Sequence, residues 1–253
     1  MSALLALEFP PVSHVIEWPA GPLGINKVAV IYVFGTLLTL TLFWLAARKR
    51  KLVPSGVQTI VESSVDFVRN GIIMQTMGSD GLAYLPILTT MFFFIFFSNL
   101  TGILPGIQMP ANARMAMPAV LAIMVWAIYM TVGIMKQGPF TFLKNSTWPP
   151  GVPLPIKILL VAPIEFLQVL IVRPFSMAVR LFANMLAGHL ILVTFSVLCA
   201  ALWAAKVTIV ILPFSFALLV FLSAFEILVC FLQAYIFTIL AAVFIGSSLH
   251  PEH

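Results

Sequence analysis

The fold is decided by the stretch KILLVAPIEFLQVLIVRPFSMAVRLFANMLAGHLILVTFSVLCAALW, which occupies residues 157–203. It is apolar over more than 40 residues, and no cluster of polar turn residues interrupts it. A second stretch of this kind, residues 206–248, follows a short break near Lys206. A helix of that length extends about 60–70 Å, whereas the hydrocarbon core of a bilayer is about 30 Å thick. Each stretch therefore forms either two spans joined by a turn or one long, kinked helix that is strongly tilted in the membrane.

The composition agrees with a membrane protein. Of the 253 residues, 62% are hydrophobic and 8% are charged, and the mean hydropathy is +1.12. Soluble domains carry roughly 25% charged residues, so this chain cannot cover a soluble surface. The net charge of +5 is no sign of nucleic-acid binding, because the few basic residues lie mostly at segment ends. We expect one all-α integral membrane domain over residues 1–253.

Three shorter spans precede the long stretches. Each has about the 20 apolar residues that a bilayer requires, and they are predicted at residues 28–47, 82–104 and 115–136. Together with the two long stretches, they make about five membrane-embedded helices.

The basic residues orient these spans. Four consecutive cations, residues 48–51, follow the first span and mark its cytoplasmic end. The N-terminal segment 1–26 then lies on the outer side. Residues 138–156 are rich in proline and glycine, and Lys136 and Lys144 accompany them. They are predicted to form a cytoplasmic loop.

Residues 55–76 have a different pattern. Polar residues recur at helical spacing on one side, and apolar residues fill the other; the polar set is Gln58, Glu62, Asp66, Arg69 and Asn70, and the apolar set is Val57, Ile60, Val61, Val65, Val68 and Ile72. This segment is too polar to span alone. It is predicted to be an amphipathic helix along the cytoplasmic interface or packed on a neighbour.

Ionisable residues lie inside the two long stretches. They are Glu165, Arg173, Arg180, His189 and Glu226. A charged side chain at the bilayer centre costs about 2.5–3.5 kcal/mol on insertion scales. Such residues are therefore functional candidates, together with nearby Asn184 and Gln233.

Helical phase groups these residues. Arg173, Arg180 and Asn184 share one helix face with Ala187, and Ser176 and Ala183 flank it. Small side chains let another helix approach closely. On the last stretch, Glu226 and Gln233 are seven residues apart and also share a face.

Chemistry separates the roles of these groups. Arginine stays protonated, so Arg180 cannot carry protons, but it can hold a carboxylate ionised. His189 and the acids Glu165 and Glu226 can titrate. A structural alternative remains open, in which Arg180 pairs with Glu165 or Glu226 to hold helices together. Structural roles are equally open for the other polar candidates: snorkelling for Arg173 and interhelical hydrogen bonds for His189, Asn184 and Gln233.

Three motifs carry a family resemblance. The run Arg173–His189, with the core Arg180-Leu-Phe-Ala-Asn184, is similar to the signature of the a subunit of F-type ATP synthases. A second match runs from Glu226 past Gln233, and a weaker one is Ser98-Asn99-Leu-Thr-Gly-Ile-Leu-Pro105. The resemblance covers essentially the whole chain in the expected order.

The resemblance implies the stator half of a proton channel, packed against a rotating ring of c subunits. It also implies b-type peripheral stalk subunits and the remaining synthase subunits as partners. Two long, steeply tilted helices would follow the ring. Arg180 would keep each passing c-subunit carboxylate ionised and separate two aqueous half-channels.

The resemblance also assigns the other residues. Asn184 and Gln233 would be polar partners near the arginine, and His189 and Glu226 would line the outer half-channel. In some family members the acid and the histidine occupy each other's places. Glu165 matches a family acid, while Arg173 and Asn99 are secondary candidates.

Other functions and locations are weighed against this one. A secondary transporter with a midplane charged site is the alternative function, although no internal repeat supports it. A purely structural membrane subunit is a third possibility. No motif predicts a cofactor or a metal. The expected location is a bacterial plasma membrane, with the mitochondrial inner membrane as the alternative, and the coupling ion stays open between proton and sodium.

Overall fold

The computed structural model describes residues 27–48, 55–104, 111–147, 154–204 and 210–249, and contains no strand within them. Five helical runs there are long and apolar enough to cross a membrane: Val28–Arg48, Gly78–Leu100, Ala116–Gln137, Leu159–Trp203 and Leu212–Leu249. The predicted all-α membrane fold with five embedded helices is confirmed. The N-terminal segment 1–26 lies outside the described residues.

The chain divides into two compact units. Unit 1 comprises Met1–Leu40, Phe94–Arg114 and Phe182–Gln233, and unit 2 comprises Thr41–Phe93, Met115–Leu181 and Ala234–His253. Four helices contribute residues to both units: α2 (Lys27–Arg48), α5 (Leu85–Leu100), α10 (Arg173–Ala204) and α11 (Leu212–Leu249). That residues 1–253 form a single domain stays a prediction.

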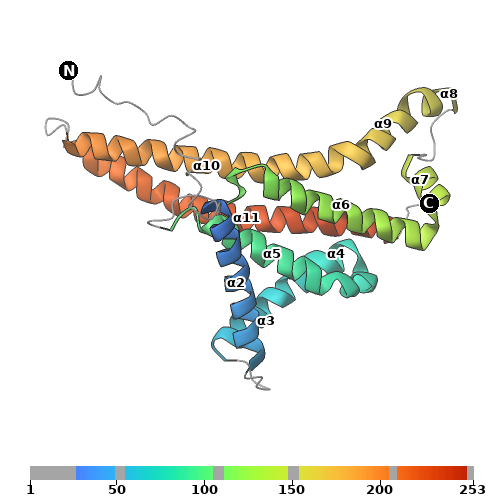
Figure 1. The fold of residues 1–253 in the computed structure, drawn as a ribbon, viewed down its shortest axis with the longest axis horizontal. Coiled ribbons are helices and arrows are strands. Elements are labelled where there is room, and N and C mark those ends of the chain that lie inside the picture. Colours follow the sequence, from blue (N-terminus) through green and yellow to red (C-terminus); the bar gives the residue numbers. More distant parts are fainter. Residues whose placement is uncertain (1–26, 49–54, 105–110, 148–153, 205–209, 250–253) are drawn as a thin grey trace. The chain divides into compact units, whose positions relative to one another are not determined.

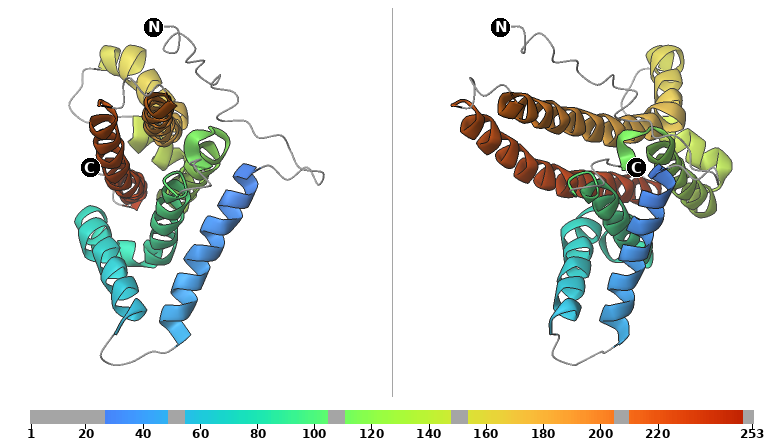
Figure 2. Two further views of the ribbon diagram at one scale, coloured as in Figure 1. Left: turned by 90° about the vertical axis from the view of Figure 1, so that its left-hand side faces the viewer. Right: turned by 60° about the vertical axis from the view of Figure 1, so that its left-hand side comes forward.

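The long apolar stretches are continuous helical runs. The first consists of α8 (Leu154–Ile156), η4 (Lys157–Val161), α9 (Ala162–Leu167), η5 (Gln168–Val172) and α10, which follow one another without a gap (Figure 1). The second, α11, is also unbroken (Figure 2). No turn therefore splits either run within its described residues. The π-helical stretches η4 and η5 widen the first run locally.

The amphipathic segment is helical in three pieces: α3 (Val57–Val68), the π-helical η1 (Arg69–Ile73) and α4 (Met74–Thr76). Val61, Val68 and Ile72 are buried, while Glu62 and Asp66 are exposed, as the pattern predicts. Three positions differ from the expectation. Gln58 is buried and donates a 2.7 Å hydrogen bond to Glu62, whereas Val57 is 41% and Ile60 is 61% exposed. The location of this helix at an interface stays a prediction.

The connection after the third span corrects the prediction of a loop. The helix α6 (Ala116–Gln137) ends at Gly138, whose φ of 82° allows the chain to turn back. The helix α7 (Pro139–Thr147) then starts with a proline, which fits the first helical position. A Cβ on Gly133 would overlap the ring of Phe142, so α7 packs tightly on α6 (Figure 1). Gly138 therefore ends α6, and Pro139 begins α7.

The second predicted span begins earlier than expected. A 3-10 stretch, η2 (Gly78–Tyr84), precedes α5 (Leu85–Leu100). Within unit 2, Gly81 packs on Met77 and Ile73, and Gly246 of α11 packs on Thr76 and Met77. Small residues therefore allow close approach at this end of unit 2.

Seven hydroxyl groups inside the described spans are satisfied within their own helix. Each donates a 2.7–2.8 Å hydrogen bond to the carbonyl four residues earlier: Thr36, Thr39, Thr90, Thr131, Thr194, Ser223 and Thr238. This pairing lets a hydroxyl enter an apolar environment without a partner from another helix.

Candidate functional site

Two arginines of unit 2 line one hollow. Arg173 begins α10, and Arg180 follows about two turns later. Both are half-buried. With Gln168, Ser176 and other residues they enclose about 240 Å³, and no carboxylate is among the lining residues that the structure describes. The Arg173 guanidinium also lies 5.2 Å from the ring centre of Phe244, a cation–π contact.

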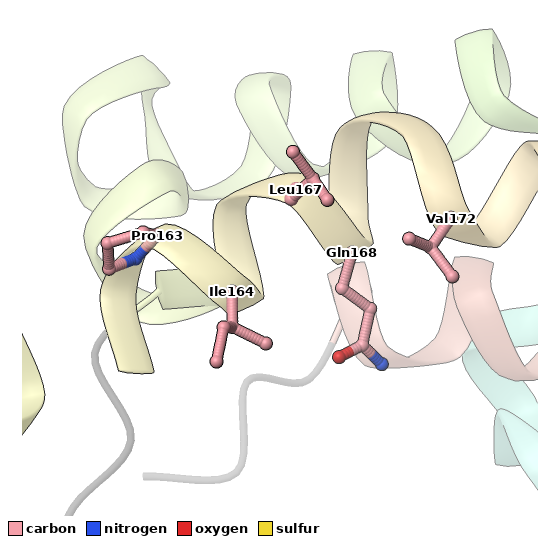
Figure 3. A pocket seen from close by; sticks show the side chains of 5 residues that line it. All are labelled: Pro163, Ile164, Leu167, Gln168 and Val172. Atoms are coloured by element: carbon pink, nitrogen blue, oxygen red, sulfur yellow. The ribbon is translucent and has the colours of Figure 1, made fainter. Parts of the chain in front are cut away.

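A shallow groove adjoins this hollow. It holds about 450 Å³ and is lined by Pro163, Ile164, Leu167, Gln168 and Val172 (Figure 3). The side chains of Gln168 and Ile164 point to the same side of the helix (Figure 3). Gln168 and Val172 line both spaces. The groove therefore leads along η5 towards the two arginines.

The arginine face of α10 also carries small, accessible residues. Ser176, Ala183 and Ala187 are exposed, as the helical phase predicts. The buried positions of α10 include Leu181 and Met185, which are fully enclosed. α10 therefore presents arginine and small side chains on its accessible side and packs through its apolar side.

In unit 1, α10 and α11 exchange a polar contact. The Asn184 amide donates a 2.8 Å hydrogen bond to the Gln233 side-chain oxygen. Asn184 is exposed, whereas Gln233 is 2% exposed. The two amide side chains that the sequence singled out, Asn184 and Gln233, therefore contact each other.

The predicted histidine and acid are both buried in unit 1. His189 is 3% exposed and Glu226 is 7% exposed. Gly188 explains how the acid fits: a Cβ at this position would overlap both carboxylate oxygens of Glu226. The absence of a side chain at Gly188 thus leaves the space that the carboxylate occupies.

Asn99 belongs to a separate polar chain in unit 1. The Tyr32 hydroxyl donates to the Asn112 side-chain oxygen at 3.0 Å, and the Asn112 amide donates to Asn99 at 2.6 Å. Nearby, a Cβ on Gly35 would lie 3.0 Å from the Ser98 hydroxyl oxygen. This chain ties α2, the end of α5 and η3 (Ala111–Ala113) together.

Glu165 lies apart from these groups. It is half-buried on α9 in unit 2 and does not line the hollow beside Arg180. Positions 165 and 180 are fifteen residues apart, which corresponds to about 22 Å along a helix. A direct ion pair between Glu165 and Arg180 is therefore excluded.

Comparison with known proteins identifies the family. The family described as ATP synthase A chain matches residues 28–246. This chain belongs to the ATP synthase A chain family. The predicted resemblance is thereby confirmed.

Bacterial relatives extend the match. ATP synthase subunit a of Frankia alni is 42% identical over 233 residues, which are 91% of this chain and 80% of the relative. That of Rhodococcus erythropolis is 40% identical over 256 residues, covering 97% and 89%. That of Rhodobacter capsulatus is 34% identical over 251 residues, covering 99% and 98%. This member of the ATP synthase A chain family is thus a multi-pass membrane protein with bacterial relatives.

Sequence reasoning missed two features of this family member. It recognised Gly188 only as part of a motif, and it did not mention Tyr129, whose hydroxyl bonds to η5. Glycine in a helix is a weak signal for close packing. For a tyrosine within an apolar span, the sequence does not show which group its hydroxyl bonds to.

Proposed function

We propose that this chain is the proton-translocating stator subunit of a bacterial F-type ATP synthase. The observation that carries the proposal is the accessible face of α10, where Arg180 lines a hollow whose described lining contains no carboxylate. The family match supports the assignment. A secondary transporter finds no support in these matches.

Arg180 acts as a fixed cation towards a carboxylate of another chain. An arginine keeps its proton at any accessible pH, and a charge in an apolar span is stabilised by a partner. Ser176, Ala183 and Ala187 leave room beside it for a neighbouring helix. A carboxylate on a helix of each passing c subunit supplies the charged partner and fits in that room. Held ionised, that carboxylate cannot carry its proton past Arg180, so protons do not short-circuit the ring.

Protons reach and leave the ring through two aqueous half-channels. His189 and Glu226 line the outer one and pass protons, because both side chains can titrate. Asn184 and Gln233 orient groups near the arginine through their hydrogen bond. Glu165, Arg173 and Asn99 have secondary roles.

The partners follow from this role. The c-subunit ring faces α10, b-type peripheral stalk subunits hold the chain still, and the remaining synthase subunits make ATP. The complex resides in the bacterial plasma membrane.

The test is replacement of Arg180 by alanine or lysine in the assembled synthase. We expect assembly to persist and proton-driven ATP synthesis in membrane vesicles to be abolished. The control is Arg69→Ala, because Arg69 is an exposed arginine of η1 in a different environment. Normal synthesis in the Arg180→Ala complex would refute the proposal, and loss of assembly alone would favour a structural role for this arginine.

A further inference from the structure

Tyr129 makes an unusual contact inside unit 2. It lies in α6 and is 1% exposed. Its phenol O–H donates a hydrogen bond to the backbone carbonyl of Val169 in η5. Carbonyls inside helices normally accept from backbone N–H groups four or five residues later. A phenol that bonds to such a carbonyl suggests that the backbone donor is missing.

The backbone of η5 accounts for the missing donor. In an α-helix, the N–H of Arg173 would donate to Val169, but it donates to the carbonyl of Gln168 instead. The next residue, Pro174, has no N–H. Neither the α-type nor the π-type donor is therefore available to Val169. A carbonyl without a donor is costly in a membrane, and Tyr129 supplies the donor.

The same π turn sets the direction of the arginines. A π turn holds one residue more than an α turn, so removing it would rotate the following helix by about 100°. Arg173 and Arg180 both follow η5 on α10. Whether they line the hollow thus depends on keeping the π turn.

A second contact reinforces the first. The ring of Tyr129 lies 5.9 Å from that of Phe244, and the Arg173 guanidinium lies 5.2 Å from the same Phe244 ring. Tyr129 thus touches both the backbone before Arg173 and the aromatic ring against which Arg173 packs.

We propose that Tyr129 is a positioning residue for Arg180 and Arg173, which holds the π turn by bonding to the carbonyl that Pro174 leaves without a donor. The proposal rests on the proposed function of Arg180. It adds a residue on a different helix, α6, which acts on the arginines through the backbone of η5.

The test begins with Tyr129→Phe in the complete synthase. This change keeps the ring and removes only the hydroxyl. We expect proton-driven ATP synthesis per assembled complex to fall roughly fivefold to tenfold, the lower end of the range for leaving a buried carbonyl unpaired. The matched control is Tyr235→Phe, because the Tyr235 ring contacts Phe67 away from η5. We expect that variant to retain its rate.

The decisive variant is the double substitution Tyr129→Phe with Pro174→Ala. Alanine at position 174 restores a backbone N–H that can bond to Val169. We expect the double variant to be more active than Tyr129→Phe alone, which a general loss of packing would not produce. If Tyr129→Phe lowers assembly instead of rate, the same comparison is made on the amount of assembled complex.

The outcomes separate this inference from the proposed function. Normal synthesis by Tyr129→Phe, beside an inactive Arg180→Ala complex, would overturn only the role of Tyr129. A double variant no better than Tyr129→Phe would also overturn it. Normal synthesis by Arg180→Ala would instead refute the proposed function.

Discussion

The two parts of α10 differ in how they enclose their ionisable side chains. In unit 2, Arg173 and Arg180 are half-buried and line a hollow without a described carboxylate. In unit 1, His189 is buried, and so is Glu226 of α11. A permanent charge cannot be neutralised and needs a partner or water, whereas histidine and glutamate can become neutral and tolerate enclosure. The proposed function requires this difference, because it has the cation act on another chain and the titratable groups act within this one.

The largest expected effect tests that difference directly. Arg180→Ala should lower ATP synthesis by roughly 100-fold or more, as expected when one partner of a charge pair is removed, while passive proton flux through the membrane sector persists. Glu226→Gln should lower both quantities, because it removes a proton-carrying group. Vesicle assays of synthesis and passive flux measure them. Equal loss of passive proton flux in both variants would contradict the expected difference between Arg180, which blocks direct proton passage, and Glu226, which carries protons.

A smaller effect is expected at the histidine. His189→Ala should slow proton flow at least about tenfold, because positioned acid–base groups contribute that much or more. The rate should also vary less between about pH 5 and 8, where imidazole changes its charge. Proton flux measured against pH provides the test, with Thr194→Val on α10 as the control. An unchanged pH profile would argue against a proton role for His189.

The space beside Glu226 gives a further, smaller prediction. Gly188→Ala should lower ATP synthesis about fivefold, since the added methyl overlaps the carboxylate of Glu226. Glu226→Asp in the same chain should recover part of the rate, because the shorter acid withdraws from position 188. The control is Gly71→Ala, where a Cβ would lie 3.6 Å from Phe67, an ordinary contact. No recovery in the double variant would contradict this packing.

The smallest effect concerns the polar chain of unit 1. Asn112→Ala removes hydrogen bonds to Tyr32 and Asn99 and should destabilise the protein by about 1–3 kcal/mol. Thermal unfolding of the purified complex in detergent measures the change, with exposed Asn70→Ala as the control. ATP synthesis per assembled complex should remain normal. A specific loss of ATP synthesis would instead indicate that the hydrogen-bonded residues Tyr32, Asn112 and Asn99 take part in proton transfer.

Much of the fold was predictable because membrane helices leave a strong pattern. Apolar length alone located five helical runs, and their described bounds lie close to the predicted ones. The loop predicted at 138–156 was wrong in part, because Gly138 and Pro139 end one helix and begin the next. Proline and glycine mark both loops and helix ends, so composition cannot separate the two.

The candidate site was predictable where residues share a helix. The small face around Arg180 follows from periodicity, and the contact between Asn184 and Gln233 joins two residues that the sequence had singled out. The place of Gly188 against Glu226 did not follow, because it depends on how two distant segments pack.

The sequence by itself determined the membrane environment, the helical spans and the presence of a permanent cation among titratable groups. These follow from composition and from the 3.6-residue period. Only the tertiary structure decided that a phenol on α6 bonds to a carbonyl in η5, the π turn that precedes the arginines of α10. A one-residue change of helical phase leaves no trace in composition, because it depends on which carbonyls find donors once the helices are packed.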